Sequence, residues 1–423
     1  MLHPGQLDPL RHLAPDLAEG FHSLPMANVE VRSVFVASNV EVVLELPGLQ
    51  VPMNGPGHCE GMPIDREMLH DVTSQQILLQ PERIYRLRQA MVVGTDLALG
   101  GGGELISSAG LISNDGSARL LQEATAAHHH HGCLFWSASD GYRVLFQSMA
   151  PHEQCAQRAI FLPNLEPSNY GSFLLRVLPC LSLLAESSFL YDLLIVPSRT
   201  AWLVEALDIL GLQGIPVLES QEIAGCIFRE LLYIDASTIE GFWNPYSYNR
   251  TMQQLLRGCA RQPQPAIAGR LFVSRRLSHR ARPWYRPLIN EADLIISCKD
   301  RGYVVVHPEA LSLSQQILLF SKANAVIGPS GSGLLNSIFC SPGSVVSDLE
   351  SFHVTLRQHA KAYASTGKAY GFGFGLFAGD ELDVPPYMRS WQVPLPIVGS
   401  LLDWMESRLS MASGFSSADI RII

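Results

Sequence analysis

The first third of the chain is predicted to contain β-strands, because its hydrophobic residues alternate with polar ones. Residues Val29–Ala37 and Val40–Leu46 repeat in this way every two residues, which is typical of strands buried on one face. Prolines and glycines separate such runs, and Gly100–Gly103 and Ser113–Ser117 have the composition of loops and turns. We therefore expect residues 1–150 to form a β-rich N-terminal extension, to which the pattern assigns no fold.

From about residue 155 onward, short apolar runs alternate with segments of helical spacing. Asn169 can cap a helix that runs to Leu184, and a buried-strand pattern follows at Asp192–Val196. A second helix is expected from Thr200 to Gly211. The other elements expected in this first α/β unit, residues 151–262, are strands at 159–162, 215–218 and 229–234 and a helix at 246–259. Such alternation predicts a mostly parallel sheet covered by helices.

The Pro-rich segment Arg261–Gly269 has no periodicity and is the best candidate for a linker. A second α/β unit, residues 263–423, is expected after it. Its predicted strands are 270–276, 303–307, 325–328 and 344–349, and its predicted helices are 290–300, 312–322, 333–340 and 353–366. Ser312 and Gln315 have the spacing of a capping box. A last helix is expected at Ile397–Met411. It is expected to reach back and pack over the first α/β unit.

Composition excludes several classes of protein. With 47% hydrophobic and 16% charged residues, the chain is not of the disordered type. A formal net charge of −9 argues against nucleic acid as a partner, since such proteins are usually basic. No apolar run reaches the about 18 residues of a membrane span, and no signal-peptide pattern is visible. The eight cysteines form no CxxC pair, which favours reduced thiols and a cytoplasmic location.

Candidate chemistry lies at the ends of three predicted strands in the second unit. In parallel sheets, ligands bind beyond the carboxyl ends of strands, against helix N-termini. The loop Gly328–Gly333 follows one strand, and its glycines allow backbone amides to approach an anion. It lacks the lysine of a phosphate-binding P-loop and the pattern of a dinucleotide-binding loop. Taken alone, it is equally compatible with a tight strand-to-helix turn.

The other two strand ends carry charge. Arg275 and Arg276 stand at the end of the strand expected at 270–276, and guanidinium groups pair well with phosphate. Glu309 follows the strand at 303–307, and a carboxylate there can accept the hydroxyls of a ribose. Each pattern alone is more typical of a solvated strand end. Their coincidence at one edge of one predicted sheet is what suggests a nucleotide site.

The order of these motifs resembles glycosyltransferase family 61. The resemblance covers about residues 155–375. It begins with Asn169–Tyr170 and Leu178–Pro179 and continues with Arg270–Arg276, Ile289–Glu291, Gly302–Tyr303, Pro308–Glu309, Leu311–Ser312, Gln315–Ile317, Ala323–Gly328, Gly331–Asn336 and Phe339. Bacterial members of this family are often assigned to capsular or exopolysaccharide synthesis.

The resemblance implies a GT-B fold, in which two Rossmann-like domains face a cleft, and an inverting transfer from a nucleotide-sugar to a glycan or lipid-linked glycan. It implies no metal and no further cofactor, and at most a peripheral membrane association. The residues expected to bind the donor are Arg275, Arg276, Glu309, Ser330, Gly331, Ser332, Gly333 and Asn336; Asn336 would order the loop or contact the donor. The residues expected on the acceptor side are Asn169, Tyr170 and Trp243.

The chain departs from the family pattern at three positions. Ser172 and Ser330 stand where the family usually has histidines, and Arg176 stands where an acidic residue is usual. Serine is a poor general base at neutral pH, so a catalytic role of Ser172 needs a partner. Glu166, between a predicted strand and the helix capped by Asn169, is the replacement base that we expect, and His152 is a weaker candidate.

Three further features have both a functional and a structural interpretation. The run His128–His131 could bind a metal, but an ordinary loop is the more common case. Trp243 could stack on a sugar or pack in a core. Residues Tyr370–Gly375 have the composition of an aromatic loop that closes over a donor base or ends the domain.

Two alternatives to a glycosyltransferase remain open. One is an inactive GT-B relative that binds a sugar nucleotide or glycan and acts as a scaffold, which the absent histidines favour. The other is an enzyme similar to polysaccharide pyruvyltransferases, whose donor is phosphoenolpyruvate. Donor binding without turnover would identify the first, and preference for phosphoenolpyruvate over nucleoside diphosphates would identify the second.

Overall fold

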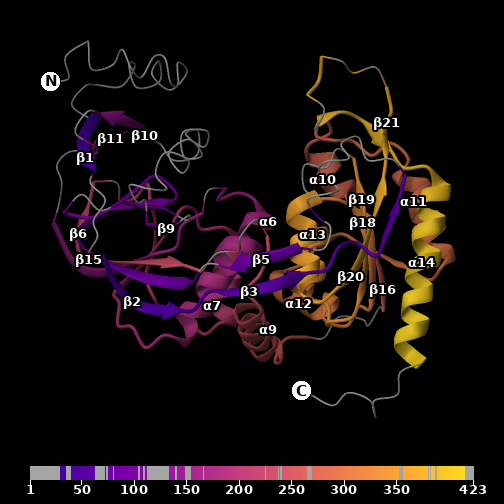
Figure 1. The fold of residues 1–423 in the computed structure, drawn as a ribbon, viewed down its shortest axis with the longest axis horizontal. Coiled ribbons are helices and arrows are strands. Elements are labelled where there is room, and N and C mark those ends of the chain that lie inside the picture. Colours follow the sequence, from indigo (N-terminus) through magenta and orange to yellow (C-terminus); the bar gives the residue numbers. More distant parts are fainter. Residues whose placement is uncertain are drawn as a thin grey trace. The chain divides into compact units, whose positions relative to one another are not determined.

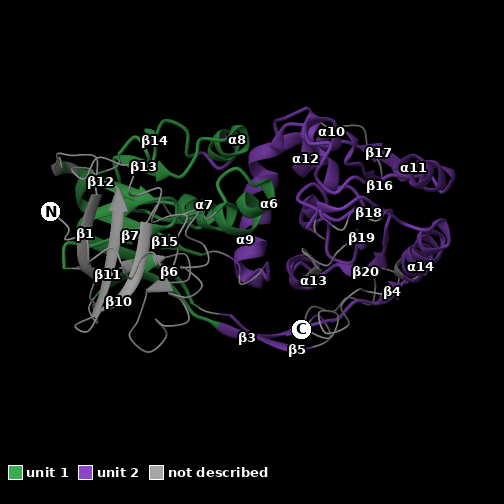
Figure 2. Ribbon diagram, turned by 90° about the horizontal axis from the view of Figure 1, so that it is seen from above, with its two compact units in different colours: residues 1–48, 81–207, 212–237 green, residues 49–80, 208–211, 238–423 purple. Residues whose placement is uncertain are grey.

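A computed structural model shows that the chain forms two compact units (Figures 1 and 2). The structure describes residues 29–34, 40–61, 72, 75–79, 81–102, 105–107, 110–111, 133–138, 141–147, 154–164, 166–223, 225–236, 238, 241–263, 269–351, 356–379, 381, 383–385 and 388–414. Unit 1 comprises residues 1–48, 81–207 and 212–237, and unit 2 comprises residues 49–80, 208–211 and 238–423. These bounds differ from the expected ones at 150 and 262.

The principal sheet of unit 1 has nine strands in the order β14-β13-β12-β15-β6-β7-β8-β9, with β2 also paired to β6. Its strands are β2 (Glu41–Leu46), β6 (Glu82–Val93), β7 (Leu97–Leu99), β8 (Leu105–Ser107), β9 (Gly110–Leu111), β12 (Gln154–Phe161), β13 (Leu193–Val196), β14 (Val217–Glu219) and β15 (Ile227–Asp235). The four strands from β12 to β15 pair in parallel, as the alternating pattern predicts.

Part of the β-rich N-terminal region, strands β2 and β6 to β9, belongs to this sheet. Strand β6 runs antiparallel to β15 from Arg83 opposite Asp235 to Ala90 opposite Phe228. The apolar residues of β6 thereby join the core formed by β12 and β15, in which Phe161 and Tyr233 are fully buried. A separate three-stranded sheet combines β1 (Val29–Val34), β10 (Cys133–Ala138) and β11 (Gly141–Gln147).

The helix predicted after Asn169 is present and contains a π-helical turn. It consists of α6 (Tyr170–Ser172), η3 (Phe173–Val177) and α7 (Leu178–Glu186). The Asn169 side chain accepts hydrogen bonds from the backbone N–H groups of Gly171 and Ser172, so the predicted cap is confirmed. The next helix, α8 (Ala201–Ile209), is followed by Gly211, whose φ of 73° is readily adopted by glycine.

Unit 2 is built on a six-stranded sheet in the order β17-β16-β18-β19-β20-β4, in which every pairing is parallel. Its strands are β4 (His58–Glu60), β16 (Arg270–Val273), β17 (Val304–Val306), β18 (Ala325–Pro329), β19 (Val345–Glu350) and β20 (Ala369–Phe374). The edge strand β4 comes from the N-terminal region. Two small two-stranded sheets are formed by β3 (Leu49–Met53) with β5 (Gln75–Leu79) and by β21 (Leu376–Phe377) with β22 (Trp391–Gln392).

The helices of unit 2 lie at or close to the predicted positions. They are α9 (Pro245–Cys259), α10 (Arg276–Ala281), α11 (Glu291–Asp300), η4 (Pro308–Ala310), α12 (Leu313–Phe320), η5 (Leu334–Phe339), α13 (Leu356–Ser365) and α14 (Leu395–Gly414). Both hydrogen bonds of the capping box predicted at Ser312 and Gln315 are present. The short helices α10 and η4 were not predicted; the strand expected at 270–276 ends where α10 begins.

The C-terminal helix α14 corrects one expectation. It belongs to unit 2, where it contacts α11 and the strands β4, β19 and β20. Leu401, Leu402 and Met405 are fully buried in the same core as Trp391. The helix is therefore part of the unit-2 core.

The prediction of an aromatic loop at Tyr370–Gly375 is wrong. Residues 369–374 form the buried strand β20, between β19 and β4. A Cβ at Gly371 would lie 2.7 Å from the His58 carbonyl oxygen, and one at Gly373 would lie 2.6 Å from Leu401 Cδ1. The glycines are therefore required because β4 and α14 approach the strand closely, so this segment cannot close over a ligand.

The predicted linker does not separate the two units, because α9 before it and β16 after it both belong to unit 2. Residues 264–268 of that segment lie outside the described residues. Among the described residues, the cysteines form no disulfide, and Cys180, Cys259, Cys298 and Cys340 are buried. No helix in the described ranges has both the length and the apolar character needed to cross a bilayer.

Candidate functional site

The strand order of unit 2 marks one edge of its sheet as the place for a ligand. The chain passes from β16 to β17 on one side and then returns to β18 on the other side of β16. In open parallel sheets, ligands bind beyond the carboxyl ends of the strands at such a reversal. Ser274 and Arg275 follow β16 at this point, and the loop Ser330–Gly333 follows β18.

The glycines of this loop allow close contact between neighbouring segments. A Cβ at Gly328, in β18, would lie 2.5 Å from the Val273 carbonyl oxygen of β16. Gly331 has a φ of 149°, which other residues rarely adopt. The following helix η5 is a 3₁₀ helix of six residues. The predicted strand–turn–helix is thus present, with a shorter and tighter helix.

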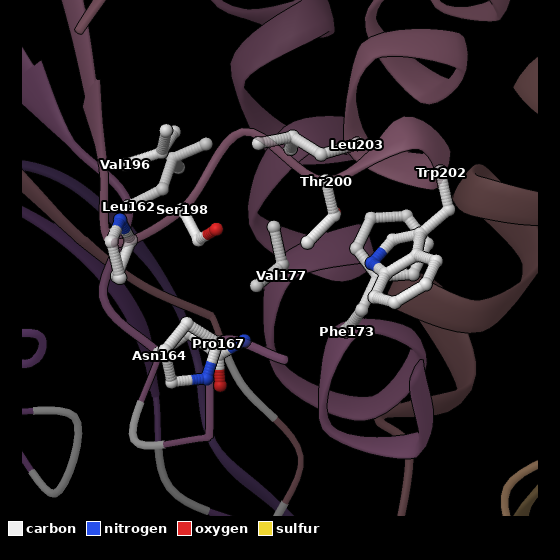
Figure 3. A pocket seen from close by; sticks show the side chains of 11 residues that line it. Leu162, Asn164, Pro167, Phe173, Val177, Val196, Ser198, Thr200, Trp202 and Leu203 are labelled. Atoms are coloured by element: carbon white, nitrogen blue, oxygen red, sulfur yellow. The ribbon is translucent and has the colours of Figure 1, made fainter. Parts of the chain in front are cut away.

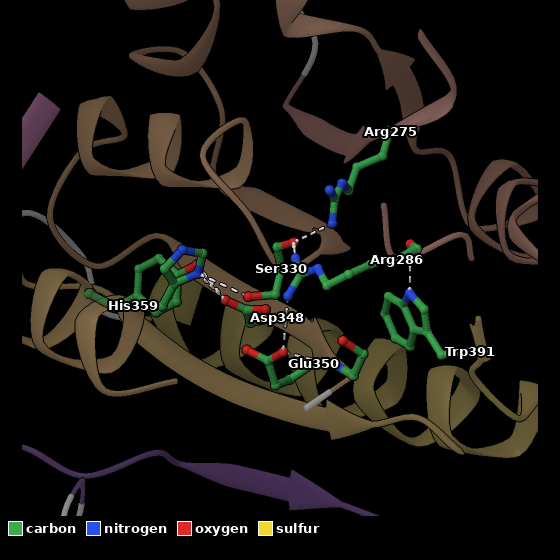
Figure 4. A network of polar contacts seen from close by, with 9 residues as sticks. Arg275, Arg286, Ser330, Asp348, Glu350, His359 and Trp391 are labelled. Atoms are coloured by element: carbon green, nitrogen blue, oxygen red, sulfur yellow. Dashed lines mark hydrogen bonds and ion pairs between the residues drawn. The ribbon is translucent and has the colours of Figure 1, made fainter. Parts of the chain in front are cut away.

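Two arginines meet on one backbone carbonyl oxygen of the loop (Figure 4). Arg275 Nη1 donates to Ser330 O at 3.0 Å, and Arg286 Nη2 donates to the same oxygen at 2.7 Å. Burial and the neighbouring Arg286 charge lower the pKa of Arg275 to about 10. Sequence analysis predicted Arg275 and missed Arg286, which lies in an irregular segment far from the loop in sequence.

Arg286 has several features that are typical of functional positions. Only 3% of the residue is exposed, and its φ of 49° is uncommon for a residue other than glycine. Its Nη1 lies 3.8 Å from Oε1 of the buried Glu350, whereas its buried Nε has no hydrogen-bond partner among the described residues. Trp391 Nε1 donates to the Arg286 carbonyl oxygen at 3.2 Å and holds the backbone in place.

A buried polar network lies beside Ser330. His359 Nδ1 is 2.5 Å from Asp348 Oδ2, and Tyr363 OH donates to that same oxygen at 2.8 Å. Ser330 Oγ is 3.5 Å from His359 Nδ1. Because Ser330 and Asp348 both contact the same nitrogen, the histidine cannot relay a proton between them as in a serine–histidine–aspartate triad. The network instead holds the loop in position.

His279 is a further side chain that the sequence analysis did not single out. Burial and the charges of Arg275 and Arg286 lower its pKa to about 4, so the imidazole is neutral at neutral pH. Its Nδ1 lies 3.9 Å from Oε2 of Glu291, which also accepts hydrogen bonds from Ser274 Oγ at 2.6 Å and Arg275 N at 2.9 Å. Glu291 therefore fixes the turn that carries Arg275.

Other predicted donor residues have different surroundings. The Arg276 side chain is exposed, and its backbone N–H donates to Ser274 Oγ. Glu309 is exposed and accepts a hydrogen bond from Ser278 Oγ of α10. Asn336 is fully buried and donates to Gln316 Oε1 at 2.7 Å and Gly333 O at 3.0 Å. Of its two expected roles, the structure supports ordering of the loop.

The candidate catalytic residues Glu166 and Ser172 lie on unit 1, after β12. Ser172 is buried, and its hydroxyl donates to Asn164 Oδ1 at 2.6 Å. This bond engages the Ser172 proton in holding Asn164, which does not support the expected catalytic role. Glu166 is exposed, and its carboxylate accepts a hydrogen bond from Asn169 Nδ2 at 3.3 Å. Its position at the helix start leaves it available to a ligand.

A small pocket adjoins these residues (Figure 3). Its lining is largely apolar and includes Phe173 and Trp202, with Asn164, Ser198 and Thr200 as polar members. Tyr170 contacts Trp202 edge-on with ring centroids 5.5 Å apart. The predicted acceptor-side Tyr170 therefore belongs to an aromatic group at the beginning of α6 and α8.

Trp243, in contrast, is not available for sugar stacking. Only 1% of it is exposed, and it packs edge-on against Tyr248 within unit 2. The histidines at 128–131 and His152 lie outside the described residues. Among the residues that are described, no group of three His, Cys, Asp or Glu side chains is arranged to hold a metal ion.

Comparison with known proteins identifies one matching family model. Residues 170–347 match the family model described as Glycosyltransferase 61. This segment belongs to the glycosyltransferase 61 family. It runs from α6 to β19 and includes Arg275, Arg286, Glu309 and the loop Ser330–Gly333. No curated protein matches the chain.

Proposed function

We propose that the protein is an inverting GT-B-type glycosyltransferase that moves a sugar from a nucleotide-sugar donor to a glycan acceptor in polysaccharide biosynthesis. The family match supports glycosyl transfer. The observation that carries the donor assignment is the convergence of Arg275 and Arg286 on Ser330 O, at the strand reversal of unit 2. Two guanidinium groups held at such an edge suit the diphosphate of a nucleotide-sugar.

In this proposal the diphosphate takes the place of the Ser330 carbonyl oxygen as acceptor for Arg275 and Arg286. The loop Gly331–Gly333 presents backbone amides and the Ser332 hydroxyl to the same group. Glu309 accepts a ribose hydroxyl, for which it exchanges the hydrogen bond from Ser278. The two guanidinium groups and the donors of the loop stabilise the leaving diphosphate, on which negative charge develops as the bond to the sugar breaks.

The acceptor is proposed to bind at the start of α6 on unit 1. Its hydroxyl oxygen attacks C1 of the donor sugar, the bond from C1 to the diphosphate oxygen breaks, and the configuration at C1 inverts. The proton of the attacking hydroxyl passes to the Glu166 carboxylate, which acts as general base. Ser172 acts indirectly, since its hydrogen bond to Asn164 holds the segment that carries Glu166.

Thermal shifts with UDP, GDP, CDP, dTDP and CMP, each with and without EDTA, test the donor site. A ligand that binds only the native state raises the unfolding temperature. We expect one diphosphate to do so regardless of EDTA, and Arg275→Ala to abolish the shift while Arg257→Ala, at an exposed position on α9, preserves it. Phosphoenolpyruvate is tested in parallel. A shift with phosphoenolpyruvate and with none of the nucleotides, or equal shifts in both variants, would contradict the assignment.

A scaffold protein without turnover is the second candidate. The observation that favours it is the hydrogen bond of Ser172 to Asn164, which engages the hydroxyl at a position where the family usually has a histidine. Hydrolysis of the matching sugar nucleotide by the wild type, and its loss in Glu166→Gln with the nucleotide-induced thermal shift preserved, would support the transferase. Equal turnover in Glu166→Gln would rule out this base, and nucleotide binding with no turnover would favour the scaffold.

A further inference from the structure

A short segment beside the proposed donor site has an unusual charge. Residues 275–286 contain five arginines and no acidic residue, although the chain as a whole has a net charge of −9. Arg276, Arg280 and Arg282 are exposed, and none of them forms an ion pair with any described residue. The acidic side chains that contact α10 in the described residues are Glu309, which Ser278 binds, and the buried Glu291, which lies 3.9 Å from His279. Exposed positive charge therefore remains in excess here.

This charge is organised around one tyrosine ring. The guanidinium carbons of Arg275, Arg282 and Arg286 lie 5.8, 5.6 and 5.7 Å from the centre of the Tyr285 ring. Trp284 packs edge-on against the same ring at 6.0 Å, and 59% of Trp284 is exposed. Tyr285 thus connects the buried arginine pair at Ser330 to an exposed arginine and an exposed tryptophan.

We infer that Arg280, Arg282 and Trp284, called here the arginine–tryptophan surface, bind an acidic glycan whose sugars carry carboxylates. The inference rests on the proposed glycosyltransferase function. A guanidinium group pairs with a carboxylate through two hydrogen bonds, and an indole ring packs on the apolar face of a pyranose. Arginines beside an exposed tryptophan provide both interactions at once.

An anionic lipid surface is the alternative that the observations favour less. Peripheral membrane binding usually combines positive charge with several apolar side chains that enter the bilayer interface. Within residues 276–286, all of which the structure describes, Trp284 is the only large hydrophobic side chain that is exposed. The surface is also continuous, through Tyr285, with the arginines of the proposed donor site, as expected for a surface that binds a substrate.

Calorimetric titration of the full chain with oligogalacturonides, and with the same oligosaccharides after reduction of their carboxylates to alcohols, tests the inference. We expect the wild type to bind the acidic form and not the reduced form. Arg282→Gln is expected to weaken binding about tenfold, the size of one charge-assisted contact. Trp284→Ala is expected to weaken binding by a similar factor, because it removes the ring that packs on the sugar. The matched controls, Arg257→Gln and Tyr246→Ala on exposed positions of α9, are expected to leave it unchanged.

Three outcomes would overturn the inference: equal binding of the acidic and reduced oligosaccharides, equal loss in the control variants, or absence of binding to the acidic form. Flotation with phosphatidylglycerol vesicles that depends on Arg282 and Trp284, without oligogalacturonide binding, would assign the surface to lipid instead. Nucleotide thermal shifts on the same variants separate the two proposals. If oligogalacturonide binding depends on this surface but no nucleotide binds, the surface is supported and the donor assignment fails.

Discussion

At the scale of single residues, the backbone carbonyl of Ser330 is the centre of the candidate site. Arg275 and Arg286 both donate to it, and the side-chain network of His359 and Asp348 holds the same residue from the other side. A carbonyl oxygen is a weaker partner for two guanidinium groups than an anion. The arrangement therefore keeps both arginines in place and able to exchange this oxygen for a charged ligand.

Arg286→Gln is expected to lower the free energy of unfolding by about 3 kcal/mol, since it removes a charge paired with the buried Glu350 and a bond to Ser330 O. Urea unfolding followed by circular dichroism measures this. The exposed Arg282→Gln is the control, with an expected change of about 0.5 kcal/mol or less. Similar losses of unfolding free energy in both variants would show that the buried pair of Arg286 and Glu350 contributes no more to stability than an exposed arginine.

His279 is expected to make stability depend on pH between its unfolded and folded pKa values. In the folded chain its pKa is lowered to about 4, whereas the ordinary value is 6.5. The unfolded state therefore binds the proton more readily, and the stability that the neutral imidazole contributes is lost as the pH falls from about 6.5 to about 4. His279→Gln should reduce this loss when urea midpoints at pH 7 and pH 4.5 are compared. An unchanged pH dependence would contradict the assignment.

At the scale of elements, β20 shows how packing assigns a segment that its composition leaves ambiguous. Alternating glycines and aromatics in Tyr370–Gly375 are typical of a loop, but here they are the two faces of a central strand. The aromatic rings Tyr370 and Phe372 pack in one core, while Gly371 and Gly373 face β4 and α14.

Gly371→Ala is expected to destabilise unit 2 by about 2 kcal/mol, within the range found for overpacked cores. Its Cβ would lie 2.7 Å from a backbone oxygen of β4, which cannot move without loss of strand pairing. Gly379→Ala is the control, because no atom lies within 4 Å of a Cβ there. Thermal unfolding of both variants gives the comparison, and equal unfolding temperatures would show that β4 yields easily.

At the scale of the whole molecule, the N-terminal region contributes strands to both principal sheets. Strand β6 pairs with β15 in unit 1, and β4 pairs with β20 in unit 2. Both units thus depend on residues that precede the family match at 170–347. Neither α/β sheet is complete without them.

A chain that begins at residue 151, the boundary expected from composition, is therefore predicted not to fold cooperatively. It would lack β6 and β4, which exposes the unpaired edges of β15 and β20 and their apolar faces. A chain that begins at residue 29 is the control and should unfold cooperatively. Circular dichroism and size-exclusion chromatography measure the outcome, and a monomeric, cooperatively unfolding chain from 151 onward would contradict the prediction.

Much of the local structure could be predicted from the sequence, because it depends on neighbours along the chain. The caps at Asn169 and Ser312 and the strands of both parallel cores, except β4 and β20, were predicted at or near the right places. Of the candidate site, Arg275 and the loop at Ser330 were found, since both follow strands directly. Arg286 could not be found in this way, because its partners Ser330 and Glu350 are distant in sequence.

The sequence by itself determined most of the strands and helices, where the chain changes from a β-rich region to alternating elements, and which strand ends carry arginine, glycine and glutamate. Only the tertiary structure decided that β4 and β6 enter different units, that Trp243 is buried, and that Arg286 shares an acceptor with Arg275. The reason is physical: periodicity and capping act within one or two turns of chain, whereas burial and shared hydrogen-bond partners depend on which distant segments pack together.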